Sequence, residues 1–210
     1  MLFVSCKKDK KVITVDLGTN YFPREVGSWV IYDVDSIIHD DNDDQAGKID
    51  TIRFKLKEII ESEFTDTTGA LNQRIERYVK ISDTSDWVIK DVWSSRVDNF
   101  RAIQVEENIN FIKLIFVPEV GETWNGNAYN TLEEWEYEYT EVDIQDTINS
   151  LVLDSVLTIV QQDDANIIES EYSEEKYARG VGRVSRTYIF LDIQNESGLE
   201  YYELINSFGK

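Results

Sequence analysis

The sequence is poor in the residue types on which disulfides, metal sites and many catalytic centres depend. Its 210 residues include one cysteine, one histidine, one methionine and two prolines. A single cysteine excludes an internal disulfide and any multi-cysteine zinc or iron–sulfur site, and a single histidine excludes sites with several histidine ligands. No nucleophile-elbow, phosphate-loop, zincin or dinucleotide-binding motif occurs. These absences predict a chain that is not an enzyme and that holds no metal or cofactor.

Long apolar runs and positive charge are also scarce. No run of about 18 apolar residues is present, so we expect no membrane-spanning helix. The 21 lysines and arginines stand against 41 aspartates and glutamates, which gives a net charge of −20. An electrostatic field of this sign repels a polyanion, so nucleic acid is not an expected partner. The apolar share of 41%, with 12% aromatic residues, is nevertheless enough to build a core.

The chain does contain alternation with a period of two. It is clearest over residues 134–139, where glutamates face one side of a strand and aromatic residues face the other. At residues 140–142 the apolar phase shifts by one position, which predicts a bulge. No segment has convincing helical periodicity, although residues 169–177 are expected to hold one helical turn. We therefore predict an all-β fold of about ten antiparallel strands in a curved meander, forming an open or closed barrel-like sheet. A two-sheet β-sandwich is the alternative.

The first residues resemble the end of a bacterial lipoprotein signal peptide. An apolar stretch and a small residue, Ser5, precede Cys6, and a charged tether follows. The resemblance implies that residues 1–5 are a signal-peptide remnant and that Cys6 carries the acyl chains that attach the protein to a membrane. Residues 6–20 are then a tether with a short first strand near residues 12–15, and residues 21–210 form a single β-rich domain. The implied location is the outer membrane, facing the periplasm or the cell surface.

Four short segments, residues 21–23, 27–32, 124–127 and 177–184, resemble a family of uncharacterised Gram-negative bacterial lipoproteins. This resemblance implies a place in the cell envelope and brings with it no activity, substrate or catalytic residue. The segment 177–184 also resembles lipoprotein domains that curl a sheet around an apolar groove. A likeness of fold does not fix a function.

An aromatic row supplies the candidate ligand contacts. Trp135, Tyr137 and Tyr139 share one face of a strand, and Trp124 stands beside a tight-turn dipeptide. Such a row can stack on sugar rings or line an apolar groove, and its alternative role is to fill the core of the sheet.

Two groups of charged residues are the other candidates. The acidic residues 40–44 do not follow an EF-hand pattern, so we expect a solvated turn there. We expect the interspersed arginines to pair with acidic neighbours across strands rather than to bind an anionic ligand: Arg77, Arg96, Arg101, Arg179, Arg183 and Arg186.

Taken together, these features predict a lipid-anchored envelope protein that acts as a non-catalytic binding or interaction module. One alternative is a carrier of a lipid or other apolar ligand in the concave face of the sheet, which an interior cavity of several hundred Å³ would favour. The other is a carboxylate-based glycan hydrolase, which two carboxylates in a cleft, one with a pKa raised by burial, would favour.

Overall fold

The computed structural model describes residues 15–40 and 48–210 of the chain. Strands account for most of these residues, and one short 3-10 helix precedes them, so the predicted all-β class is confirmed. The elements are η1 (Thr19–Tyr21), β1 (Trp29–Asp40), β2 (Lys48–Thr65), β3 (Leu71–Lys80), β4 (Val88–Asp98), β5 (Arg101–Glu106), β6 (Ile109–Ile115), β7 (Thr123–Asn125), β8 (Glu136–Ile148), β9 (Leu151–Ala165), β10 (Glu169–Ala178), β11 (Gly182–Asp192) and β12 (Ser197–Gly209).

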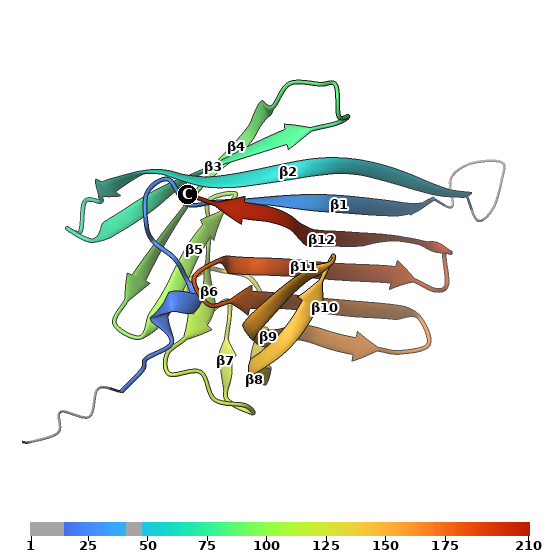
Figure 1. Ribbon diagram of the computed structural model, residues 1–210. Coiled ribbons are helices and arrows are strands. Elements are labelled where there is room, and N and C mark those ends of the chain that lie inside the picture. The colour runs from blue at the N-terminus through green and yellow to red at the C-terminus, as the bar shows by residue number, and fades with distance from the viewer. Residues whose placement is uncertain (1–14, 41–47) are drawn as a thin grey trace, which may run out of the picture.

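All twelve strands of the described residues belong to one sheet, in the order β6-β5-β4-β3-β2-β1-β12-β11-β10-β9-β8-β7 (Figure 1). Each pair of hydrogen-bonded neighbours is antiparallel. Strand β1 pairs with β12 as well as with β2, so the first and last strands join two meanders in the middle of the sheet. The architecture is therefore a single meandering sheet and not a two-sheet sandwich.

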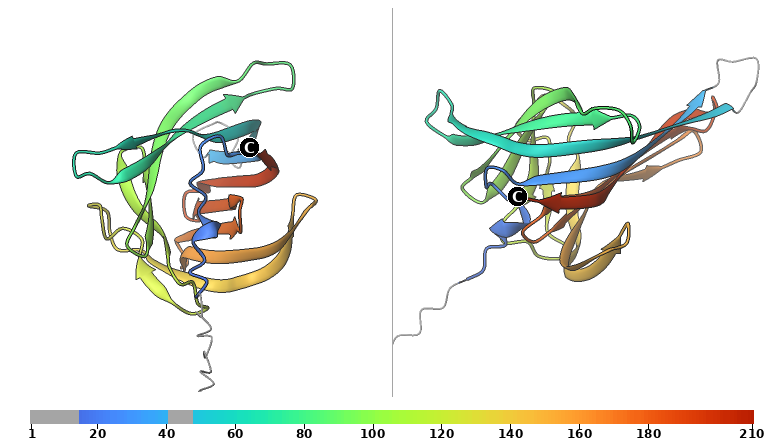
Figure 2. Two further views of the ribbon diagram at one scale, coloured as in Figure 1. Left: turned by 60° about the vertical axis from the view of Figure 1, so that its left-hand side comes forward. Right: turned by 45° about the horizontal axis from the view of Figure 1, so that its top comes forward.

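The sheet curls until its two outer strands, β6 and β7, approach each other (Figure 2). The backbone N–H of Ile112 donates to the carbonyl of Gly126, just after β7, at 2.9 Å. The indole Nε1 of Trp124 donates to the carbonyl of Ile112, also at 2.9 Å. Only glycine fits at position 126, because a Cβ there would lie 2.3 Å from the ring of Tyr137. The result is a nearly closed barrel in which little edge is left open to pair with another chain.

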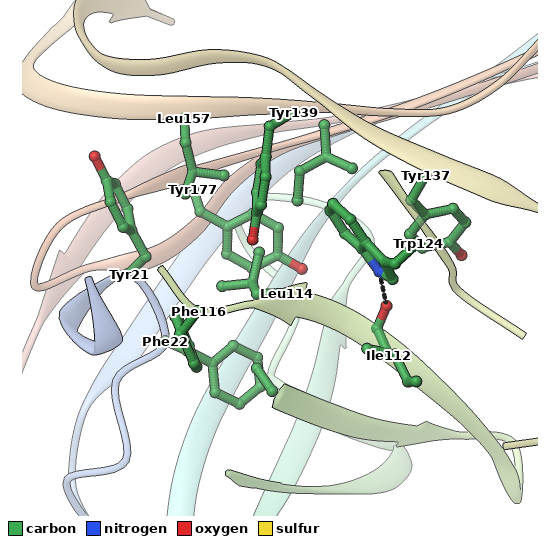
Figure 3. Packing of buried hydrophobic residues seen from close by; sticks show 12 residues of the cluster. Tyr21, Phe22, Ile112, Leu114, Phe116, Trp124, Tyr137, Tyr139, Leu157 and Tyr177 are labelled. Carbon is green, nitrogen blue, oxygen red and sulfur yellow. Dashed lines mark hydrogen bonds between the residues drawn. The ribbon is translucent and has the colours of Figure 1, made fainter. Parts of the chain in front are cut away.

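The N-terminal segment crosses one end of this barrel (Figure 2, left). The N–H of Gly180 donates to the carbonyl of Asn20 at 2.8 Å, and the rings of Tyr21 and Phe22 are buried. Both rings belong to the larger apolar cluster (Figure 3), whose buried residues are Tyr21, Phe22, Ala102, Ile112, Leu114, Phe116, Trp124, Tyr137, Tyr139, Leu157, Ile159 and Tyr177. The η1 segment therefore caps the core at this end of the barrel.

A bulge interrupts β8 where the sequence predicts it. The register against β9 shifts between Tyr139 and Glu141 and again before Ile144, and Asp143 has a positive φ of 58°. Beyond the bulge, Ile148 and Leu153 at the β8–β9 hairpin join a second apolar cluster with residues of β1, β2, β11 and β12.

The structure contains two strands that the sequence prediction of about ten did not include, β7 and β10. The helical turn expected over residues 169–177 is wrong, because these residues form β10. The alternation of β10 is hidden in the sequence because Ser173 and Glu175 are buried at positions where apolar residues are expected. Of the short first strand expected near residues 12–15, only Val15 lies within the described residues, and it is not in a strand.

Candidate functional site

A layer of charged side chains crosses the interior of the barrel. It combines five carboxylates with four cations, and we call it the ion cluster: Glu58, Asp91, Glu106, Glu175 and Glu203 with Arg77, Lys113, Arg183 and Arg186. Glu175 and Glu203 have no exposed surface. Buried charges are tolerated only when they are paired and hydrogen-bonded, so the detailed contacts of this layer determine what it can do.

One half of the ion cluster joins β5 and β6 to β10 and β11. The guanidinium of Arg186 donates from Nη2 to both oxygens of Glu106, at 2.8 and 2.9 Å, and from Nε to Glu175 at 2.8 Å. The ammonium of Lys113 lies 2.8 Å from Glu175 and 3.0 Å from Glu106. Because these strands are far apart in the sheet order, the contacts span the barrel interior.

The other half surrounds Trp93. Arg183 donates from Nη2 to Glu58 at 2.7 Å and to Glu203 at 2.8 Å. Arg77 bonds Glu58 at 2.9 Å, and its guanidinium lies 3.5 Å from the centre of the Trp93 ring. A cation over an aromatic face is attracted by the ring's negative quadrupole. Trp93 therefore adds an aromatic surface to the ionic layer.

Three carboxylates of the ion cluster, Glu106, Glu175 and Glu203, are held in their ionised form. Burial alone would raise the pKa of Glu106, but the charges of Arg186 and Lys113 outweigh it and lower the pKa to about 2. The same opposition between burial and neighbouring cations leaves the pKa values of Glu175 and Glu203 below their usual range. At neutral pH these three carboxylates are therefore charged.

A partly open cavity of about 340 Å³ lies against the Glu106–Lys113–Arg186 side of the ion cluster. Five aromatic rings contribute to its wall, and we call it the aromatic cavity; its lining residues are Glu106, Phe111, Lys113, Trp135, Tyr137, Gln161, Ser173, Arg186, Tyr188, Leu199 and Tyr201. Its volume lies in the range of small-molecule binding sites. A concave site with aromatic walls and a few convergent polar groups is suited to holding a ligand of that size.

Two polar groups in the aromatic cavity lack partners within the described part of the chain. Gln161 is only 4% exposed, yet its Nε2 makes no hydrogen bond. The hydroxyl of Tyr137 has none either, and burial together with the charges of Glu175 and Glu106 raises its pKa, so it stays protonated. The Nε2 of Gln161 has almost no accessible surface, so it is not open to a ligand in the cavity.

The structure brings all four predicted ligand-contact residues together: Trp124, Tyr137 and Tyr139 share one apolar cluster, and Trp135 packs against it. Trp135 and Tyr137 line the aromatic cavity. Trp124 and Tyr139 lie in the core, with ring centres 4.6 Å apart, and Figure 3 shows the indole of Trp124 bonded to Ile112. The aromatic row therefore shares one face as predicted and fills the core, and two of its members, Trp135 and Tyr137, also line the aromatic cavity.

The other sequence candidates lie elsewhere or outside the described residues. Cys6 and most of the acidic loop 40–44 fall outside them. Within residues 15–40 and 48–210, no group of three or more histidine, cysteine, aspartate or glutamate side chains is placed to hold a metal ion. No helix in the same residues is long and apolar enough to cross a membrane.

The ion cluster is a functional candidate that the sequence analysis did not assemble. Cross-strand pairing of the arginines was predicted, and Arg77, Arg183 and Arg186 do pair with carboxylates, but inside the barrel. The sequence did contain one signal for the ion cluster. Glu203 lies two residues from Tyr201 and from Ile205, so its side chain points to the same, inward face of the strand as theirs. A charge in an apolar phase indicates an internal partner.

No family model matches the sequence, and no curated protein matches it. Among solved structures, a protein from Bacteroides fragilis provisionally described as exported and as having a YmcC-like fold is 10% identical, with a TM-score of 0.49, over 90% of this chain and 98% of that one. A protein from Parabacteroides distasonis provisionally described as a lipoprotein is also 10% identical, with a TM-score of 0.40 and the same coverage of both chains. Likenesses at this level carry no argument about location or activity.

Proposed function

We propose that this chain is a lipid-anchored protein of the bacterial cell envelope that binds a small ligand without transforming it. In this proposal Cys6 carries the acyl chains that attach it to the outer membrane, and the aromatic cavity is the binding site. The observation that carries the binding role is the partly open cavity of about 340 Å³, with five aromatic rings and the charged groups of Glu106, Lys113 and Arg186 on its wall. A concave site with mostly apolar walls and a few convergent polar groups is typical of small-molecule binding.

The electrostatics of the cavity favour binding over hydrolysis. A carboxylate-based hydrolase needs one carboxyl that stays protonated as a general acid, which requires a raised pKa. The pKa of Glu106 is lowered to about 2, and that of the neighbouring Glu175 is lowered as well. Neither group is therefore suited to deliver a proton at neutral pH.

A carrier of an apolar ligand is the second candidate, and the cavity wall is the observation that favours it. The rings of Phe111, Trp135 and Tyr201, together with Leu199, present apolar surface to the interior. A lipid chain would gain from burial against them. It would also place its chain against the charged groups of Glu106, Lys113 and Arg186, which makes this candidate the weaker one.

Native mass spectrometry of protein purified from its own cell envelope tests the binding role. The expected result is a noncovalent adduct on the wild-type protein, and the mass of the adduct distinguishes a lipid from a polar ligand. The variant Leu199→Trp, which fills the aromatic cavity from a partly exposed position, should lose the adduct. Val152→Trp, on an exposed position of β9 outside the cavity, should keep it. Wild-type protein without an adduct, or an adduct that survives Leu199→Trp, would contradict the proposal.

Mass spectrometry of the same material tests the anchor separately. We expect the first residue to be Cys6 with attached acyl chains, since stable membrane attachment needs more than one chain. An unmodified Met1 on protein recovered from the aqueous fraction would contradict the anchor and leave the binding role intact.

A further inference from the structure

Two hydrogen-bond donors of the aromatic cavity are free to contact a ligand. The Tyr137 hydroxyl makes no hydrogen bond in the described part of the chain. Among the same residues Nη1 of Arg186 makes none either, although Nε and Nη2 of that guanidinium are bonded to carboxylates. Every fully buried side-chain atom that lacks a partner among the described residues belongs to Gln73, Gln161 or Arg183. The hydroxyl of Tyr137 and Nη1 of Arg186 therefore keep accessible surface, and both residues line the cavity.

Both groups keep their protons at neutral pH. Burial and the charges of Glu175 and Glu106 raise the pKa of Tyr137, and the positive charge of nearby Arg186 opposes them without reversing the shift. Burial lowers the pKa of Arg186, but the charge of Glu106 outweighs it, and the pKa of the guanidinium lies above its usual range. The free polar capacity of the cavity therefore includes two permanent donors.

The acceptors of the cavity wall are already engaged. Glu106 receives hydrogen bonds from Arg186 on both oxygens and lies 3.0 Å from the Lys113 ammonium. The side chains of Gln161 and Ser173 bond each other at 2.8 Å. A sugar or another polyhydroxylated ligand would bury several hydroxyl donors here with few acceptors to receive them, which is costly. The wall therefore favours a ligand that accepts hydrogen bonds and donates none.

The charges beside the cavity balance before a ligand enters. Two carboxylates and two cations contact one another there: Glu106, Glu175, Lys113 and Arg186. A carboxylate or ammonium group on the ligand would add an unbalanced charge and lose its own hydration, a cost that is recovered only with a well-placed counter-ion. A carbonyl oxygen has two lone pairs and accepts hydrogen bonds without adding a charge. The charge balance therefore favours a neutral carbonyl as the acceptor.

The wall favours a flat aromatic ring as the body of the ligand. Five rings from separate parts of the chain surround the space: Phe111, Trp135, Tyr137, Tyr188 and Tyr201. Aromatic rings attract one another beyond simple burial when they meet offset or edge to face. Rings on several sides of one space give an aromatic ligand such neighbours at its faces and its edges. The volume of about 340 Å³ is near the lower end of the range of small-molecule sites, which suits a small ring system.

We infer that the aromatic cavity binds a neutral aromatic compound that carries a carbonyl group, such as an aryl ketone. The ring of the ligand packs within the aromatic wall, and its carbonyl oxygen accepts hydrogen bonds from the Tyr137 hydroxyl and Arg186 Nη1. This inference rests on the proposed binding function and names the ligand class of the same site.

Titration of the full chain followed by NMR tests the inference with three probes at millimolar concentration: acetophenone, toluene and benzoate. We expect acetophenone to bind. Toluene should bind at least about tenfold more weakly because it leaves both donors without an acceptor, and benzoate should bind more weakly because it adds a charge. No binding of acetophenone, equal affinity for toluene, or tighter binding of benzoate would each overturn the inference.

A matched pair of variants tests the role of the free hydroxyl. Tyr137→Phe keeps the ring and removes the donor, so it should weaken acetophenone binding by at least about threefold and leave toluene binding unchanged. The control Tyr202→Phe removes a hydroxyl that donates to Glu200 outside the cavity, and should leave both affinities unchanged. Unchanged acetophenone affinity in Tyr137→Phe would overturn the assignment of the donor. An adduct in native mass spectrometry combined with no binding of acetophenone would overturn the ligand class alone and leave the proposed function standing.

Discussion

Arg186 on β11 bonds both carboxylate oxygens of Glu106 on β5, although β4, β3, β2, β1 and β12 lie between these two strands in the sheet. Hydrogen bonds between neighbouring strands form in a flat sheet as well as in a curled one. A contact between β5 and β11 across the interior forms only when the sheet curls. The Arg186–Glu106 pair therefore couples the curl of the sheet to the wall of the aromatic cavity, on which both residues lie.

The first prediction concerns the stability that this pair provides. Replacing Arg186 by leucine removes a partner from Glu106 and from Glu175 while leaving both carboxylates buried. Removing one member of a buried ion pair typically destabilises a protein by about 3–5 kcal/mol. We expect Arg186→Leu to lower the free energy of unfolding by about that amount in urea denaturation.

A surface pair provides the matched control for Arg186→Leu. Arg53 lies 3.3 Å from Asp35, and its side chain is 74% exposed. Exposed ion pairs contribute less than about 1 kcal/mol, so Arg53→Leu should change stability little. The double variant Arg186→Leu/Glu106→Leu should recover part of the loss, because it no longer leaves Glu106 short of a partner. Equal effects of Arg186→Leu and Arg53→Leu would contradict this interpretation of the ion cluster.

The second prediction is the pH dependence of stability. The pKa of Glu106 is lowered from 4.5 to about 2 on folding, and those of Glu175 and Glu203 are lowered as well. In the unfolded chain these groups bind protons more tightly than in the folded one, so acid favours unfolding. The stability they contribute is fully present above the unfolded pKa of 4.5 and is lost as the pH falls from there toward about 2.

Urea midpoints measured from neutral pH down to about pH 2 check this prediction. Part of the decline should disappear in Glu106→Gln, which cannot titrate at that position. The variant Glu136→Gln, at an exposed position of β8, should keep the wild-type slope. A wild-type midpoint that stays flat through this range, or a slope unaffected by Glu106→Gln, would show that the buried carboxylates do not govern acid stability.

The third prediction concerns the segment that caps the barrel. Arg179 bonds Asp143 through Nε and Nη2, at 2.7 and 2.8 Å, and bonds Asp16 and Asn20 through Nη1, both at 2.8 Å. Its guanidinium also lies 4.5 Å from the centre of the Tyr21 ring. One side chain thus holds the η1 segment against the β8 bulge and the β10–β11 turn.

Removing this side chain should loosen the cap without unfolding the barrel. In Arg179→Ala we expect the backbone amides of Tyr21, Phe22 and Gly180 to exchange with deuterium at least about tenfold faster, because their hydrogen bonds belong to the segment that is released. Arg101→Ala, which removes an exposed arginine from β5, should leave these rates unchanged. Unaltered exchange in Arg179→Ala would mean that the buried rings alone hold η1 in place.

The sequence predicted the sheet better than the site, and particular residues show why. Alternation is a local property, so strands such as β8 and the bulge after Tyr139 could be predicted from neighbouring residues. The pairing of β1 with β12 and the contact between Arg186 and Glu106 join residues far apart in the chain, and no local pattern encodes them. The curl that brings β5 near β11 decides which polar residues meet, and so the aromatic cavity emerged only in three dimensions.

The fourth prediction separates two tyrosines that alternate on the same strand. The hydroxyl of Tyr139 donates to the carbonyl of Ile115 at 2.8 Å and accepts from the Ile115 N–H at 3.0 Å. Tyr139→Phe removes both bonds and should lower the free energy of unfolding by about 1–3 kcal/mol.

In Tyr137→Phe, by contrast, the lost hydroxyl has no partner among the described residues, so we expect stability to change by less than about 1 kcal/mol and the noncovalent adduct seen in native mass spectrometry to be weakened. Urea denaturation and native mass spectrometry on both variants check the pair. Lower affinity in Tyr139→Phe alone, with Tyr137→Phe binding normally, would place the ligand outside the aromatic cavity.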